Sequence, residues 1–123
     1  MIHGTVNQAL EATIPMAVQG VSGQPLTIEP LIDTGFNGFL TLPPDLVASL
    51  GLPWKVRQEG LLADGSTRTF DVYAAIVIWQ GKPRIIEVEA AGLGPLLGTA
   101  LLSGHAVSLQ IIPGGTVTIA AIP

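Results

Sequence analysis

One aspartate ends a strongly apolar stretch of the chain. Asp33 directly follows Leu31 and Ile32, and Thr34 and Gly35 come after it. A carboxylate among apolar side chains is costly to bury unless it is paired, and such groups are concentrated where proteins do chemistry. Asp33 is therefore a candidate catalytic group, and an aspartate that only forms a turn is the alternative.

Two apolar segments are expected to position this aspartate. The run Leu26–Ile32 predicts a strand that delivers Asp33, and Thr34–Gly35 predicts a sharp turn. Gly38–Leu42 predicts a second strand that leaves the turn. Asp33 is thus expected in a loop with hydrophobic walls.

A second segment repeats part of this pattern later in the chain. Leu96 and Leu97 precede Gly98, at a position where a side chain is expected to collide. Thr99–Ser103 then predicts a short helix, and Gly104 is expected to end it in the left-handed conformation.

Leu31–Gly35, followed later by Pro95–Leu102, resembles the active-site loop and its supporting segment in the retropepsin-like aspartic proteases, in their single-domain bacterial form. The resemblance implies one domain over residues 1–123 and an all-β fold, a closed β-barrel with one lobe per chain and one or two short helices. It implies that Asp33 is catalytic. The residues implied to support the active-site loop are Thr34, Gly35 and Gly98.

The resemblance also implies a mechanism. Two close carboxylates share one proton, so the ionised one takes a proton from water while the protonated one polarises the scissile carbonyl. The chain has one Asp-Thr-Gly, so each chain of a homodimer would supply one Asp33. The implied function is an aspartic endopeptidase acting on a peptide or protein substrate without cofactor or metal. A catalytically weak or inactive module for peptide binding or dimerisation is the alternative.

Asp64 and Gly65 lie between two strand-like runs, which predicts a β-hairpin. In the resemblance this hairpin is the flap that closes over an extended substrate. An ordinary surface hairpin is the alternative. The flap and cleft residues implied to bind substrate are Phe36, Ala63, Asp64, Gly65 and Ser66.

The chain departs from the family pattern beside Asp33. Phe36 stands where a small residue is common, so its ring is expected to shape or crowd the cleft. Asn37 and Thr99–Ala100 stand where the family often has a supporting charged pair. Because both halves of that pair are missing together, an uncharged contact can replace it without leaving a buried charge unpaired.

Composition limits the fold and the partners. The chain has 123 residues, of which 48% are hydrophobic and 11% charged, which favours one domain with further apolar surface to cover in an oligomer. The 15 glycines and 10 prolines separate short apolar runs, as is typical of many short strands. A net charge of -4 with five basic residues argues against a nucleic-acid partner.

Other features narrow the location and the chemistry. The sequence has no cysteine, no basic and apolar leader, and no apolar run long enough for a bilayer, so we expect a soluble, cytoplasmic protein with no membrane partner. Its two histidines, His3 and His105, lack metal-ligand spacing and are expected at surface or loop positions.

The remaining elements are expected as follows. Pro43–Pro53 predicts a two-turn helix whose buried side is Leu46, Val47 and Leu50. The predicted strands elsewhere are His3–Val6, Thr13–Val18, Val72–Trp79, Arg84–Val88, Val107–Ile112 and Thr116–Ile122, with a turn at Gly20–Gly23. The edges of the first and last strands are expected to be exposed and to pair across the twofold axis of the dimer.

Overall fold

The computed structural model describes residues 1–20 and 23–123. The central two residues of the turn expected at Gly20–Gly23 lie outside the described residues. Strands make up 52% of the structure and helices 9%. The all-β class expected from the sequence is therefore confirmed.

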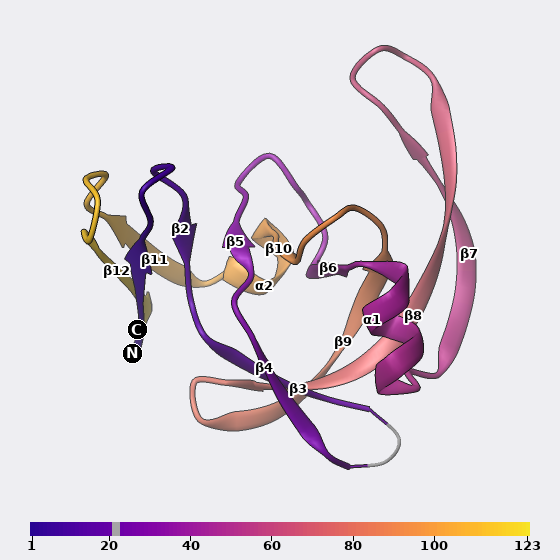
Figure 1. Ribbon diagram of the computed structural model, residues 1–123, viewed down its shortest axis with the longest axis horizontal. Coiled ribbons are helices and arrows are strands. Elements are labelled where there is room, and N and C mark those ends of the chain that lie inside the picture. The colour runs from indigo at the N-terminus through magenta and orange to yellow at the C-terminus, as the bar shows by residue number, and fades with distance from the viewer. Residues whose placement is uncertain (21–22) are drawn as a thin grey trace.

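Figure 1 shows the arrangement of the elements. The two helices are α1 (Pro44–Leu50) and α2 (Thr99–Leu102). The strands are β1 (Ile2–Val6), β2 (Ala12–Thr13), β3 (Met16–Gln19), β4 (Pro25–Ile28), β5 (Leu31–Ile32), β6 (Leu40–Leu42), β7 (Trp54–Leu61), β8 (Thr67–Trp79), β9 (Lys82–Ala90), β10 (Leu96–Leu97), β11 (His105–Leu109) and β12 (Thr116–Ala121).

The prediction of a closed barrel is wrong, because the sheet is not closed. In the described residues the strand order is β11-β12-β1-β2-β5-β10-β6-β9-β8-β3-β4, and β7 pairs with β8 beside this path. The two end strands, β11 and β4, lie in different parts of the molecule (Figure 1). Each is paired on one side by its own hairpin neighbour, β12 or β3, so no ladder joins the ends of the sheet.

The prediction that the first and last strands have exposed edges is also wrong. β1 lies between β12 and β2, and β12 lies between β11 and β1. The cause is the last hairpin, in which Gln110 N donates to Thr116 O at 3.0 Å and folds β11 against β12. In the described chain the free edge at this end of the sheet therefore belongs to β11.

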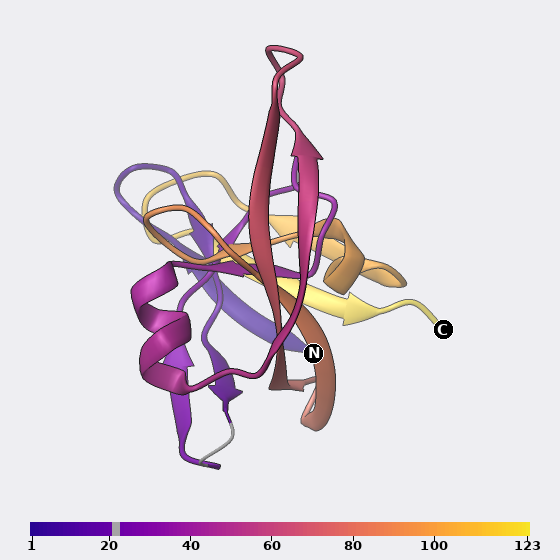
Figure 2. The same ribbon diagram turned by 90° about the vertical axis from the view of Figure 1, so that its right-hand side faces the viewer.

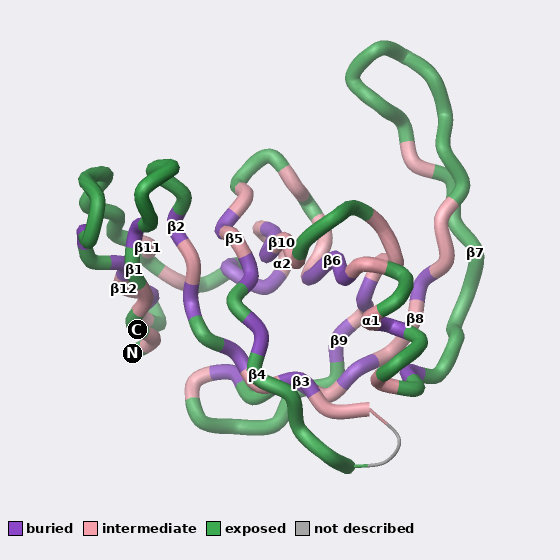
Figure 3. Tube along the Cα trace, viewed as in Figure 1, coloured by how far each residue is buried: buried purple, intermediate pink, exposed green. Residues whose placement is uncertain are grey.

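The core collects side chains from many strands and from both helices. Burial alternates along β3 and along the second half of β8, as expected for strands with one face on a core. Figure 3 shows that buried positions lie along the central strands, whereas the hairpin tips and nearly all of β7 are exposed. The most deeply buried side chains include Val18, Leu40, Leu42, Val77, Val88, Leu97, Leu101 and Ile119.

Local signals place several element ends correctly. α1 begins at Pro44 and ends at Leu50. The next residue, Gly51, caps the helix in the left-handed conformation with φ of 61°. Val47 is buried, but Leu46 and Leu50 are only half-buried. The turn between β8 and β9 has positive φ at Gln80 and Gly81, as a two-residue hairpin turn requires. None of the helices in residues 1–20 and 23–123 is long and apolar enough to cross a membrane.

Candidate functional site

The backbone of Asp33 is fixed by a strand that lies far away in the sequence. β5 and β10 pair in parallel, with Leu31 opposite Leu96 and Ile32 opposite Leu97. Asp33 N donates to Leu97 O at 2.9 Å. β10 also pairs with β6, the strand that follows the Asp33 loop. The two motifs singled out in the sequence are therefore neighbours, and β10 ties both sides of the loop together.

The Asp33 side chain caps its own turn. Gly35 N donates to Asp33 Oδ1 at 2.9 Å, and Phe36 N donates to the Asp33 carbonyl at 3.1 Å. Asp33 is half-buried, whereas Thr34 and Gly35 are exposed. Within residues 1–20 and 23–123 the carboxylate accepts this one hydrogen bond, so it is positioned by the loop and remains open to further partners.

Gly98 lies where the sequence expects a close approach. A β-carbon there would collide with the carbonyl oxygen of Gly38 and would lie 2.6 Å from Cδ2 of Phe36. A β-carbon on Gly38 would in turn lie 2.5 Å from Cζ of Phe36 and would collide with Oε2 of Glu89. The two glycines thus leave the space that the ring of Phe36 occupies.

An uncharged contact stands where the supporting charged pair is missing. Thr99 Oγ1 lies 3.3 Å from the carbonyl oxygen of Phe36 and 3.5 Å from Oδ1 of Asn37. Thr99 N also donates to Phe36 O at 2.9 Å. The start of α2 is therefore joined to the Asp33 loop through neutral groups, as expected from the sequence.

A cleft of about 380 Å³ lies between the Asp33 loop and the β7–β8 hairpin. Its lining includes Phe36, so the ring shapes the cleft, but Asp33 and Ala63–Ser66 do not line it. Most of the other lining residues were not predicted from the sequence. Glu89 could have been found, because Glu87 and Glu89 alternate with the buried residues Ile86 and Val88 along β9. The lining residues are Phe36, Asn37, Gly38, Thr41, Gly60, Leu61, Leu62, Arg68, Phe70, Glu89 and Ala91.

The hairpin projects well beyond the body of the molecule (Figure 2). At its tip Gly65 has φ of 86°, and Gly65 N donates to Leu62 O at 3.0 Å. Ser66 donates to Asp64 Oδ1 from its hydroxyl at 2.5 Å and from its amide at 2.9 Å. These hydrogen bonds, led by the hydroxyl, hold the pKa of Asp64 below its ordinary value. The expected hairpin is confirmed, and its tip is an internally bonded turn.

The base of the hairpin is held by a second carboxylate. Asp71 Oδ1 accepts from Trp54 Nε1 at 3.1 Å and from Arg57 Nε at 3.2 Å. The Trp54 and Arg57 hydrogen bonds lower the pKa of Asp71. Since both contacts bridge β7 to β8, they fix the stem of the hairpin.

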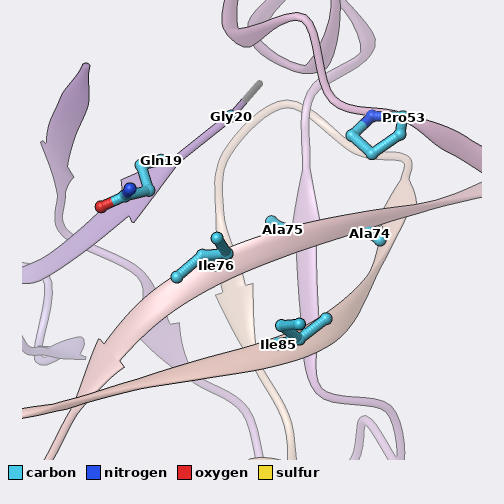
Figure 4. Close-up of a pocket in the computed structure, with 7 residues that line it drawn as sticks. All are labelled: Gln19, Gly20, Pro53, Ala74, Ala75, Ile76 and Ile85. Carbon is cyan, nitrogen blue, oxygen red and sulfur yellow. The ribbon is translucent and has the colours of Figure 1, made fainter. Parts of the chain in front are cut away.

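Another hollow, of about 250 Å³, is almost entirely apolar and is lined by the middle of β8 together with residues at the end of β3, before β7 and in β9 (Figure 4). It contains no acidic, basic or histidine side chain, so it offers no acid–base group. Neither Asp33 nor the hairpin tip borders it. Its lining residues are Gln19, Gly20, Pro53, Ala74, Ala75, Ile76 and Ile85.

His105, expected at a surface or loop position, is the half-buried first residue of β11. Its Nε2 accepts from Trp79 Nε1 at 3.2 Å, and its Nδ1 lies 2.9 Å from Ser103 O. Those two contacts fit a neutral imidazole with its proton on Nδ1. Elsewhere in the described chain, no group of three or more potential metal-binding side chains comes together.

No family model, no curated protein and no solved structure matches the chain.

Gly98→Ala is expected to lower the free energy of unfolding by about 1–3 kcal/mol, because the added carbon must displace backbone and the Phe36 ring. Urea denaturation measures the change. Gly94→Ala is the matched control, since a β-carbon on Gly94 meets nothing within 4 Å. Equal stabilities for the two variants would contradict the packing of Gly98 against the loop.

Proposed function

We propose that the protein is an aspartic endopeptidase that acts as a homodimer. The observation that carries the proposal is the setting of Asp33. Its backbone is tied to Leu97, its loop packs on Gly98, and its carboxylate is accessible and carries one hydrogen bond within residues 1–20 and 23–123. A rigidly mounted, reachable carboxylate is what general acid–base chemistry requires.

In the proposed reaction the Asp33 carboxylates of two chains lie together and hold one proton between them. The ionised carboxylate removes a proton from a water molecule, whose oxygen attacks the scissile carbonyl carbon. The protonated carboxylate donates to the carbonyl oxygen as negative charge develops there. When the tetrahedral intermediate collapses, the C–N bond breaks, the amine takes up a proton, and a new carboxylic acid leaves.

The need for two carboxylates supports the dimer. The sequence supplies one Asp-Thr-Gly, and a twofold axis is the simplest way to bring two identical loops together. Thr34 is exposed, and no bond of its hydroxyl is seen within residues 1–20 and 23–123. In the dimer that hydroxyl braces the loop of the other chain.

The hairpin is assigned the role of a flap in this proposal. Leu61 and Leu62 border the cleft in the single chain, whereas the tip residues Ala63–Ser66 do not. A substrate in extended conformation would lie across the cleft, and inward movement of the tip would exclude water from the reacting amide.

Asp33→Asn is expected to lower the rate of peptide cleavage by about 10²- to 10⁴-fold, the usual contribution of a general acid–base group. The amide oxygen still accepts from Gly35 N, so the fold is expected to survive. Cleavage of an unfolded protein between about pH 4 and pH 6 provides the assay. Asp45→Asn, at an exposed residue of α1, is the control.

The outcome separates two functions. Equal rates for Asp33→Asn and the parent would remove Asp33 from the mechanism. Peptide binding by the parent without cleavage at any pH would favour the alternative, a binding or dimerisation module that retains the loop.

Gly65→Val is expected to lower kcat/KM more than it lowers stability, because a β-branched residue resists positive φ. Gly81→Val is a matched control, since Gly81 has φ of 76° in another hairpin turn and a β-carbon there meets nothing within 4 Å. Both variants carry similar backbone strain. Equal kinetic losses in both would show that the hairpin tip has no special part in turnover.

Titration of Asp33→Asn protein into a fixed amount of the parent is expected to reduce cleavage, because mixed dimers hold one catalytic carboxylate. Specific activity should also fall on dilution as dimers dissociate. Sedimentation measures assembly in the same samples. A monomer whose cleavage stays proportional to its concentration would exclude the shared site.

A further inference from the structure

Glu89 places a carboxylate in the cleft beside the Asp33 loop. It lies near the end of β9, opposite Thr41 of β6 and Val72 of β8. Its Oε2 lies against Gly38, on the same side of that glycine as the edge of the Phe36 ring. The absence of a side chain at Gly38 is therefore what allows the carboxylate and the aromatic ring to approach each other.

No cation in the described chain neutralises this carboxylate. Lys55 Nζ forms an ion pair with Glu87 Oε2 at 2.5 Å, and Arg57 Nε forms one with Asp71 Oδ1 at 3.2 Å. These two ion pairs are the ones formed within residues 1–20 and 23–123, and neither includes Glu89. Arg68 borders the same cleft from β8, but it is exposed and forms no such pair there.

The electrostatic setting favours an incoming positive charge. Glu89 is half-buried, and this burial, followed by repulsion from Glu87, raises its pKa above the ordinary value. Both effects penalise the ionised form, and a cation that pairs with the carboxylate offsets this penalty. The charge of Arg68 is screened by solvent, so it weakens this attraction without cancelling it.

The rest of the lining suits the stem of a long side chain. Phe36 and Phe70 are aromatic walls, and Leu61 adds an aliphatic one. Lysine and arginine carry a flexible apolar stem that packs on such surfaces while the charged end reaches a carboxylate. The volume of about 380 Å³ is large enough for one such side chain.

The geometry points to Glu89 as a specificity-determining residue that selects peptides with a lysine or arginine near the cleaved bond. This inference rests on the proposed peptidase function, because it assigns a substrate class to the same site. It is separable from that function, since binding of a basic side chain in the cleft does not require Asp33 to react.

The test uses peptides that differ at one position, with lysine or its uncharged isostere norleucine moved through the residues around the cleaved bond. Binding to full-length Asp33→Asn protein is measured by fluorescence anisotropy, and cleavage is measured with the parent. At the favoured position the lysine peptide is expected to bind about tenfold more tightly, the effect of one hydrogen bond to a charged group.

Glu89→Gln in each background is expected to abolish the lysine preference. Glu87→Gln is the control, because it removes the same charge from the same strand but from a residue that pairs with Lys55 outside the cleft lining. The preference should also disappear as pH falls through the raised pKa of Glu89, where the carboxylate becomes neutral. Lys55, Glu87 and Arg68 are the charged groups nearby.

The results distinguish the two proposals. Lysine preference in binding that Glu89→Gln removes, without any cleavage by the parent, supports recognition of a basic side chain by Glu89 and rejects the peptidase. Cleavage with equal use of lysine and norleucine at every position, or a preference that survives Glu89→Gln, overturns the inference and leaves the peptidase standing. Neither binding nor cleavage of any peptide rejects both.

Discussion

The candidate site depends on the parallel pairing of two very short strands, β5 and β10. Leu31 N donates to Pro95 O at 3.0 Å, and Asp33 N donates to Leu97 O at 2.9 Å. Such a contact closes a long loop, whose entropic cost must be met by the packing it allows. Leu97 is fully buried, so the hydrogen bond that its carbonyl accepts from Asp33 N lies at the edge of the core.

Packing around Phe36 transmits this constraint to the cleft. The ring occupies the space left by Gly38 and Gly98, and the same face of Gly38 accepts Glu89. A change at any of these positions is therefore felt by the others, because close-packed interiors cannot absorb an added carbon without movement. The bulky ring of Phe36 is accommodated because Gly38 and Gly98 carry no side chain.

Much of the local structure could be predicted from the sequence, because its causes are local. Pro44 and Gly51 fix the ends of α1, and Asp64 and Gly65 lie in the expected hairpin turn. The pairing of β12 with β11 on one side and with β1 on the other could not be predicted, since one strand pattern fits an edge or an interior position. Glu89 was missed for a similar reason, because its neighbours in the cleft come from strands remote in sequence.

One continuous segment joins the proposed catalytic loop to β11, an edge strand of the sheet. β10 anchors Asp33, α2 begins directly after Gly98, and β11 follows α2 after two residues. Ile122 N donates to Gly104 O at 2.9 Å and so ties the last strand to the connection between α2 and β11. An edge strand has unsatisfied backbone groups that favour pairing with another chain. In the proposed dimer, a contact made at β11 would therefore reach Asp33 through a short and well-packed path, so that assembly and the geometry of the active site are coupled.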